Sequence, residues 1–147
     1  ADAMGSMAFE GARIIRELRP QVVLGHDPWK RYRLHPDHRH AGLLACEGIV
    51  AARDPHFFRD HGVGPHRPEA LLLWEADAPD HAEDVSGFVD AKLDALAAHE
   101  SQFESTMKAI DDEQLAAFGQ RIRNRLGDLG RPFDMDAAEV FKLIVDL

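Results

Sequence analysis

The chain contains only two apolar runs of strand length, and this small number limits the possible fold more than any other feature. Residues 21–25 are rich in β-branched side chains and follow Pro20, which ends the helical pattern of residues 9–19. This run indicates a strand that is buried on both faces. Residues 69–76 form the second run. Helical patterns alternate with both runs, so the predicted class is α/β.

The other predicted elements follow the same alternation. Further helices are expected at residues 36–50, 85–103, 112–126 and 137–145, with a turn at 77–84. This order is typical of a Rossmann-like, mostly parallel sheet with flanking helices. Because a stable open sheet usually has about four to six strands, two strands predict an N-terminally truncated domain. Residues 1–6 resemble a cloning scar and are taken as a tag remnant, which leaves residues 7–147 as one partial domain.

Composition excludes several classes of protein. Lysine and arginine number 17 against 26 aspartates and glutamates, a net charge of −9 that argues against a nucleic-acid binder. The single cysteine, Cys46, excludes an intramolecular disulfide and a multi-cysteine zinc site, and it is expected to be a small buried hydrophobe. No run of about 18 apolar residues predicts a membrane span, and no secretory pattern begins the sequence, so a cytoplasmic location is expected.

Histidine is the residue type that points to chemistry. Seven of the nine histidines lie between positions 26 and 66, and imidazole is the commonest protein ligand for transition metals. In the motif His35-Pro36-Asp37-His38, proline fixes the first turn of a helix, so both imidazoles can face one crevice after a strand. Asp37 could accept the second N–H of either ring. The alternative is a helix-capping turn with solvated histidines, because a four-residue motif arises readily by chance.

Two blocks of sequence resemble the LmbE-like, or PIG-L, zinc deacetylases. Residues 13–41, RIIRELRPQVVLGHDPWKRYRLHPDHRHA, resemble the family's second block, in which an IR-x-x-RP helix end, an apolar strand, a DP dipeptide and HPDH follow one another. Residues 91–102, AKLDALAAHESQ, resemble the family's K-x-x-AL-x-x-H-x-SQ helix. The resemblance implies a Zn²⁺-dependent N-deacetylase, an amide hydrolase that acts on a small N-acetylated amino sugar.

The resemblance also assigns roles within the motif. It implies that His38 is a zinc ligand, that His35 polarises the amide carbonyl and stabilises the tetrahedral intermediate, and that Asp37 orients His35. These roles agree chemically, because zinc acidifies a bound water and polarises the acyl oxygen. A positioned imidazole can then donate a proton to the oxyanion or to the departing amine.

The sequence departs from the family at an earlier block, A-HPDDE. In the family this block supplies a second zinc-binding histidine, a zinc-binding aspartate and the general base, and no HPDD occurs in this chain. Since catalytic zinc normally has three protein ligands, the chain as written is expected to lack a competent metal site and activity. The alternative function is a non-catalytic truncated domain that covers its open sheet edge by pairing with itself, as a homo-oligomer, or with another chain.

The loop between the first strand and HPDH supplies further candidates. His26 and Asp27 could replace the missing ligands, but the family keeps Asp-Pro for the turn, which favours a structural or site-lining role for both residues. Trp29 and Arg33 are candidates for binding substrate together with Asp27, with the indole under a pyranose ring and the cation near a phosphate or carboxylate. The alternative is a solvated loop whose Trp29 packs on the sheet edge.

Overall fold

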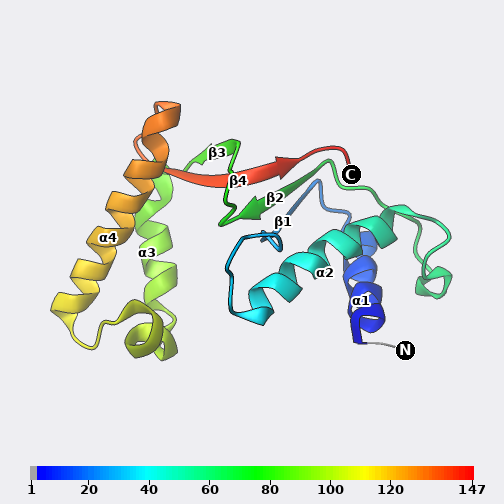
Figure 1. The fold of residues 1–147 in the computed structure, drawn as a ribbon, viewed down its shortest axis with the longest axis horizontal. Coiled ribbons are helices and arrows are strands. Elements are labelled where there is room, and N and C mark those ends of the chain that lie inside the picture. Colours follow the sequence, from blue (N-terminus) through cyan, green and yellow to red (C-terminus); the bar gives the residue numbers. More distant parts are fainter. Residues whose placement is uncertain (1–2) are drawn as a thin grey trace. The chain divides into compact units, whose positions relative to one another are not determined.

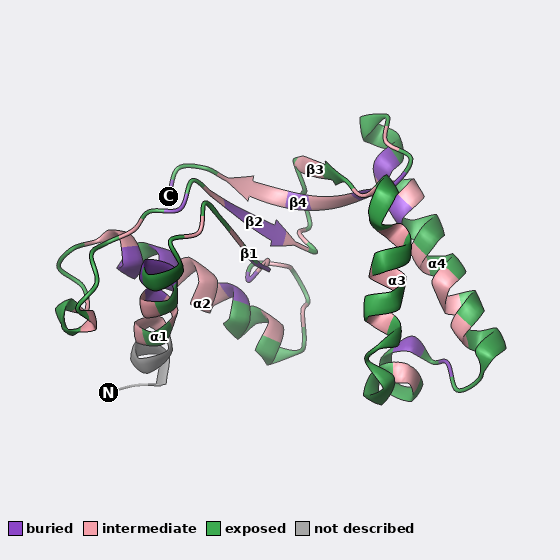
Figure 2. Ribbon diagram, turned by 180° about the vertical axis from the view of Figure 1, so that it is seen from behind, coloured by how far each residue is buried: buried purple, intermediate pink, exposed green. Residues whose placement is uncertain are grey.

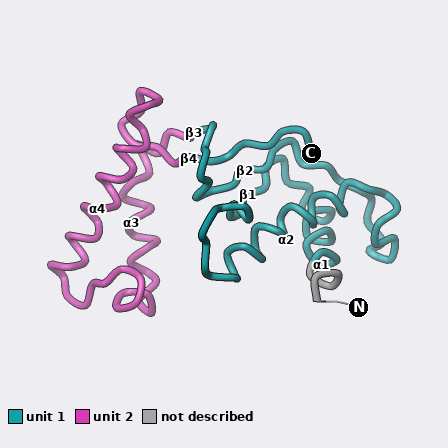
Figure 3. The backbone as a smooth tube through the Cα atoms, viewed as in Figure 1, with its two compact units in different colours: residues 1–81, 141–147 teal, residues 82–140 magenta. Residues whose placement is uncertain are grey.

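The computed structural model describes residues 3–147, and side chains from Ala8 onward. Ala1 and Asp2, part of the predicted tag remnant, lie outside the described residues. The chain divides into two compact units, the first comprising Ala1–His81 and Phe141–Leu147 and the second Ala82–Val140 (Figure 3). None of the helices in residues 3–147 has the length and apolarity that a bilayer crossing needs.

The first unit consists of two helices packed on a small part of the sheet. Its elements are α1 (Ala3–Leu18), β1 (Val22–His26), α2 (Pro36–Arg53), a 3₁₀ turn (Arg59–His61), β2 (Ala70–Trp74) and the second half of β4 (Ala138–Ile144). β1 and β2 are parallel, and β4 is antiparallel to β2. The four strands have the order β1-β2-β4-β3 (Figure 1). The predicted α/β class is therefore confirmed, with a sheet of mixed direction.

The core of the first unit lies where α1 and α2 meet the sheet, as the buried residues in Figure 2 show. It consists of Ala12, Ile15, Ile49, Ala51, Ala52, Leu71, Leu73 and Leu147. Val23 and Cys46 pack against it, so the expectation that the cysteine acts as a small apolar residue agrees with its half-buried position.

The prediction that β1 is buried on both faces is wrong. β1 ends the strand order, and Val22 and Leu24 are 43% and 53% exposed. Side chains alternate between the two faces of a strand, and in β1 only the face that carries Gly25 meets α2, where Gly25 approaches Ala45 closely. The β-branched composition of the run is therefore that of an edge strand with one covered face.

The second unit contains a helical hairpin with few buried residues. Its elements are β3 (His81–Asp84, with His81 in the first unit), a 3₁₀ turn (Ser86–Phe88), α3 (Val89–Ala97), a 3₁₀ turn (Glu100–Gln102), a π-helical turn (Phe103–Met107), α4 (Asp112–Gly130), a 3₁₀ turn (Arg131–Phe133) and the first half of β4. Arg123 on α4 pairs with Asp90 on α3 at 2.6 Å. The two helices are exposed over most of their length (Figure 2).

Three predicted elements differ in this part of the chain. The helix predicted at residues 137–145 is wrong, because these residues form β4. The predicted turn at 77–84 includes β3, and the predicted helix at 85–103 is limited to α3 with short turns on both sides. Gly127 does not end α4, which continues to Gly130.

Candidate metal centre

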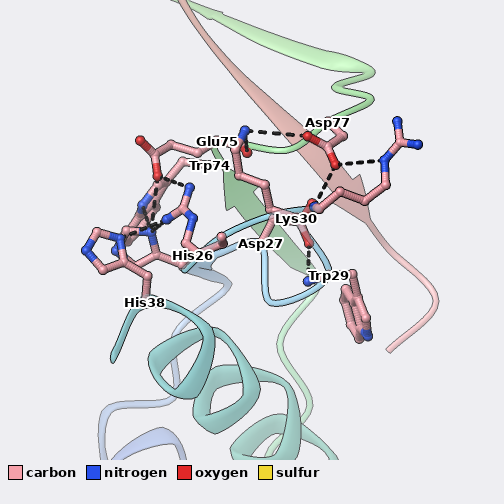
Figure 4. Close-up of polar contacts among 10 residues, drawn as sticks. His26, Asp27, Trp29, Lys30, His38, Trp74, Glu75 and Asp77 are labelled. Carbon is pink, nitrogen blue, oxygen red and sulfur yellow. Dashed lines mark hydrogen bonds and ion pairs between the residues drawn. The ribbon is translucent and has the colours of Figure 1, made fainter. Parts of the chain in front are cut away.

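The parallel pairing of β1 and β2 brings the ends of two strands together. His26 is the last residue of β1 and pairs with Trp74, the last residue of β2. Glu75 follows directly and has a left-handed backbone with φ 58°. His38 enters from the first turn of α2, where Pro36 opens the helix. Carboxyl ends of parallel strands are the usual ligand-binding edge of α/β sheets, and Figure 4 shows these side chains converging there.

Three of these side chains form a group that could hold a metal ion. One ligand atom from each of His26, His38 and Glu75 lies within 4.8 Å of the others. The two imidazole rings have centroids 4.3 Å apart, and His26 Nδ1 is 3.6 Å from a Glu75 carboxylate oxygen. Two histidines and one glutamate are a known ligand set of catalytic zinc, so the donor set fits this metal.

The guanidinium of Arg33 lies against the same three residues. Its Nη1 is 2.8 Å from His38 Nδ1 and 3.3 Å from His26 Nδ1, and its Nη2 pairs with the Glu75 carboxylate. The indole N–H of Trp74 also donates to His26 Nδ1, at 2.8 Å. Guanidinium and indole groups only donate, so Nδ1 of both histidines must be the acceptor and the neutral rings carry their proton on Nε2.

The surroundings of His26 and Glu75 favour the neutral imidazole and the ionised carboxylate. Burial lowers the pKa of His26, and the nearby imidazole of His38 lowers it further. Burial alone would raise the pKa of Glu75, but the hydrogen bond and charge of Arg33 hold it below its ordinary value. These are the protonation states that a metal ion requires of its ligands.

His35 and Asp37 lie beside this group, at the exposed N-terminus of α2. His35 is the N-cap residue, and its Nδ1 accepts the backbone N–H of Asp37 at 3.3 Å. The ring of His35 is 5.2 Å from that of His38, and the Asp37 carboxylate is 3.9 Å from His35 Nδ1. The structure therefore brings the two histidines of the motif together, while the capping turn that was the alternative is also present.

The loop after β1 contains a turn and an open pocket. Asp27 Oδ1 accepts the backbone N–H of Trp29 at 2.9 Å, and the backbone N–H of Asp27 donates to the carbonyl of Trp74 at 3.1 Å (Figure 4). Asp27 therefore holds the turn, and Lys30 Nζ donates to the carbonyl of Glu75 at 2.7 Å. An adjoining pocket of about 370 Å³ is lined by Pro28, Trp29, Lys30, Tyr32, Arg33, Arg39 and Leu43.

Reasoning from sequence missed one member of the group. Glu75 lies within the strand predicted at residues 69–76, where no motif marks it as a ligand, and the sequence favours a structural or site-lining role for His26. The available signal was positional: residues that end two neighbouring parallel strands lie at one edge, so a histidine and a glutamate at both ends are neighbours. Using it required the knowledge that residues 21–25 and 69–76 pair in parallel.

Several known proteins that resemble this chain in sequence are sugar deacetylases. Diacetylchitobiose deacetylase of Thermococcus kodakarensis is 42% identical over 93 residues, which are 61% of this chain and 35% of that protein. The 1D-myo-inositol 2-acetamido-2-deoxy-alpha-D-glucopyranoside deacetylase of Segniliparus rotundus is 32% identical over 130 residues, covering 67% of this chain and 41% of that protein. No family model matches the chain.

A solved structure gives the same result. N,N'-diacetylchitobiose deacetylase from Pyrococcus horikoshii matches with a TM-score of 0.80 at 25% identity, over 96% of this chain and 52% of that protein. The predicted resemblance to the LmbE-like, or PIG-L, deacetylases is thus confirmed. The chain spans between about a third and a half of the length of these relatives.

Proposed function

We propose that this chain carries the metal-binding part of a zinc-dependent N-deacetylase that hydrolyses the acetamide of a small N-acetylated amino sugar. The observation that carries the proposal is the convergence of His38, from the HPDH motif, with His26 and Glu75 at the edge where β1 and β2 end. The relatives' names supply the substrate class, because they are deacetylases of N-acetylglucosamine derivatives. The cytoplasmic location expected from the sequence stays a prediction.

The ion would be held by His38, His26 and Glu75. When bound, zinc supplies polarisation of the acyl oxygen and a more acidic water. Because the Nδ1 of His35 accepts the Asp37 backbone N–H, the neutral ring carries its proton on Nε2 and would donate a hydrogen bond from there to the oxyanion. Transfer of a proton to the departing amine would come from the doubly protonated ring, which returns to the neutral form. The Asp37 carboxylate, 3.9 Å from His35 Nδ1, would stabilise the ring in its charged form.

The pocket beside the cluster is the proposed place for the sugar. Trp29 is 62% exposed and offers an aromatic face for a pyranose ring, while Arg33 and Arg39 supply donors for hydroxyl or anionic groups. Asp27 would act through the turn that positions Trp29.

Zinc titration and acetate release test the proposal together. We expect the chain to bind one zinc ion, His38→Ala to weaken binding at least tenfold, and His40→Ala, a change at an exposed residue of the same helix, to leave it unaltered. Acetate release from N,N'-diacetylchitobiose would be measured for this chain and for the full product of its gene. Equal zinc affinity in the His38→Ala variant, or no acetate from either protein with any N-acetylated amino sugar, would show that the proposal is wrong.

A second candidate is a non-catalytic domain that pairs with another copy of itself. It is favoured by the exposed apolar side chains of Val22 and Leu24 on the end strand β1. Sedimentation at tens of micromolar protein is then expected to show a dimer that Leu24→Lys dissociates. A monomer at this concentration would contradict this candidate and leave the first unaffected.

A further inference from the structure

We propose that the guanidinium of Arg33 occupies the cation position among His26, His38 and Glu75, so that a metal ion binds by displacing it and Arg33 sets the metal affinity of the cluster. The inference rests on the proposed function for the identity of the ion as zinc. It adds a role that the resemblance does not assign to this residue: an internal cation that competes with the metal.

The contacts of Arg33 use the lone pairs that a metal would need. Its two terminal nitrogens reach Nδ1 of His38, Nδ1 of His26 and a carboxylate oxygen of Glu75. Because the protons of both neutral rings lie on Nε2, each imidazole has its lone pair on the Nδ1 that faces Arg33. One lone pair cannot accept a hydrogen bond and coordinate a metal at once. The guanidinium and the ion therefore exclude each other.

The charges at the site also oppose simultaneous binding of the Arg33 guanidinium and a metal ion. The side chain of Arg33 is only 11% exposed, and it neutralises the carboxylate of Glu75 directly. A divalent ion placed among the same ligands would lie beside this positive charge in a partly desolvated site, where like charges repel strongly. Ion binding thus requires the guanidinium to leave.

An open pocket beside Arg33 could accept its guanidinium when a metal ion displaces it. Its side chain also lines the open pocket of about 370 Å³. The neighbouring side chains Tyr32 and Leu34 are both 93% exposed, so packing of these side chains does not restrain the loop around Arg33. A rotation of the Arg33 side chain into the pocket would free His38 Nδ1 and the Glu75 carboxylate, and would leave the Trp74 indole as the remaining donor to His26 Nδ1. It would also bring a cation to the proposed sugar site.

Zinc affinity of a matched pair of variants tests this inference. Arg33→Gln and Arg39→Gln each remove one positive charge from the lining of the same pocket. Of these two arginines, Arg33 is the one that hydrogen-bonds to the cluster. Affinity would be measured by competition with a chromophoric zinc chelator at one fixed pH. We expect Arg33→Gln to bind zinc about tenfold more tightly than the unmodified chain, because a charge-assisted network no longer has to be broken. Arg39→Gln is expected to stay within about twofold of it.

The outcomes separate this inference from the proposed function. If Arg33→Gln binds zinc no more tightly than Arg39→Gln while His38→Ala abolishes binding, Arg33 is not a competitor and the inference fails alone. If no variant binds zinc through His38, both proposals fail.

A measurement on the unmodified chain keeps the test valid if Arg33→Gln does not fold. In nitrogen-detected NMR, the Arg33 side-chain N–H signals are expected to be protected from exchange without metal and to lose that protection as zinc is added. Protection that persists at saturating zinc would overturn displacement.

Discussion

Arg16 on α1 is a buried cation that holds the end of α2, and its removal tests how this packing is stabilised. The residue is 3% exposed. Its Nε donates to the carbonyl of Ala52 at 3.0 Å, and its Nη2 donates to those of Ala51 at 2.9 Å and Asp54 at 2.8 Å. The guanidinium also contacts the carbonyls of Phe57 and Phe58 and Nδ1 of His61. The last carbonyls of a helix lack partners within it, so Arg16 acts as an external C-cap for α2.

Arg16→Met keeps the apolar stem and removes the donors, which allows the cost to be worked out from the structure. The carbonyls of Ala51 and Ala52 belong to residues that are 4% and 0% exposed, so water cannot easily replace the lost partner. Each unsatisfied buried group costs about 1–3 kcal/mol, which gives about 2–6 kcal/mol for the two. The carbonyls of Asp54 and Phe57 belong to less buried residues, can be solvated and add little. A loss of this size lowers Tm by roughly 2–4 °C per kcal/mol in a chain of this length.

Tryptophan fluorescence during urea unfolding is the appropriate assay, because both tryptophans, Trp29 and Trp74, lie in the first unit. Arg13→Met is the matched control on the same helix, since Arg13 forms exposed ion pairs with Glu10 and Glu17 that contribute little to stability. Equal losses of unfolding free energy in the two variants would refute the reasoning, because burial and carbonyl contacts are what distinguish them.

Three further predictions concern other parts of the chain. Gly42→Ala places a Cβ 2.3 Å from the carbonyl oxygen of His26 and is expected to lower the free energy of unfolding by about 1–3 kcal/mol and to weaken zinc binding. Gly119→Ala, with its nearest neighbour atom at 3.8 Å, is the control and is expected to be neutral or stabilising. Thermal unfolding followed by circular dichroism measures the stability of both variants. Burial raises the pKa of Cys46 to about 11, so only about one thiol in a thousand is ionised at pH 8, and rapid reaction with a disulfide reagent in the folded chain would contradict this. Asp111→Ala removes the N-cap of α4, whose carboxylate accepts the backbone N–H of Gln114, the third residue of the helix, at 2.8 Å. The variant is expected to lose about 1 kcal/mol of unfolding free energy in the same thermal measurement, while Asp111→Asn retains most of it.

Local sequence signals predicted the elements around the site and failed where pairing is non-local. Pro20 and the apolar run after it located β1, and Pro36 located the start of α2. Residues 137–145 have an apolar pattern that suits a helix or a strand. They form the strand β4 because they pair with β2, more than sixty residues earlier in the chain. The same limit applies to the cluster: HPDH predicted His38, but Glu75 joins it only through the parallel register of β1 and β2.

The distance between the two histidines of the cluster is set by residues that have no chemistry of their own. A Cβ on Gly25 would lie 3.1 Å from Ala45, and one on Gly42 would overlap the carbonyl oxygen of His26. These close approaches allow α2 to lie directly on the end of β1, and His38 is one turn before Gly42 on that helix. A larger side chain at either position must move α2 away from β1 and separate His38 from His26. Small residues at this crossing are therefore as necessary to the proposed metal centre as the ligands, and zinc affinity in Gly42→Ala measures that dependence.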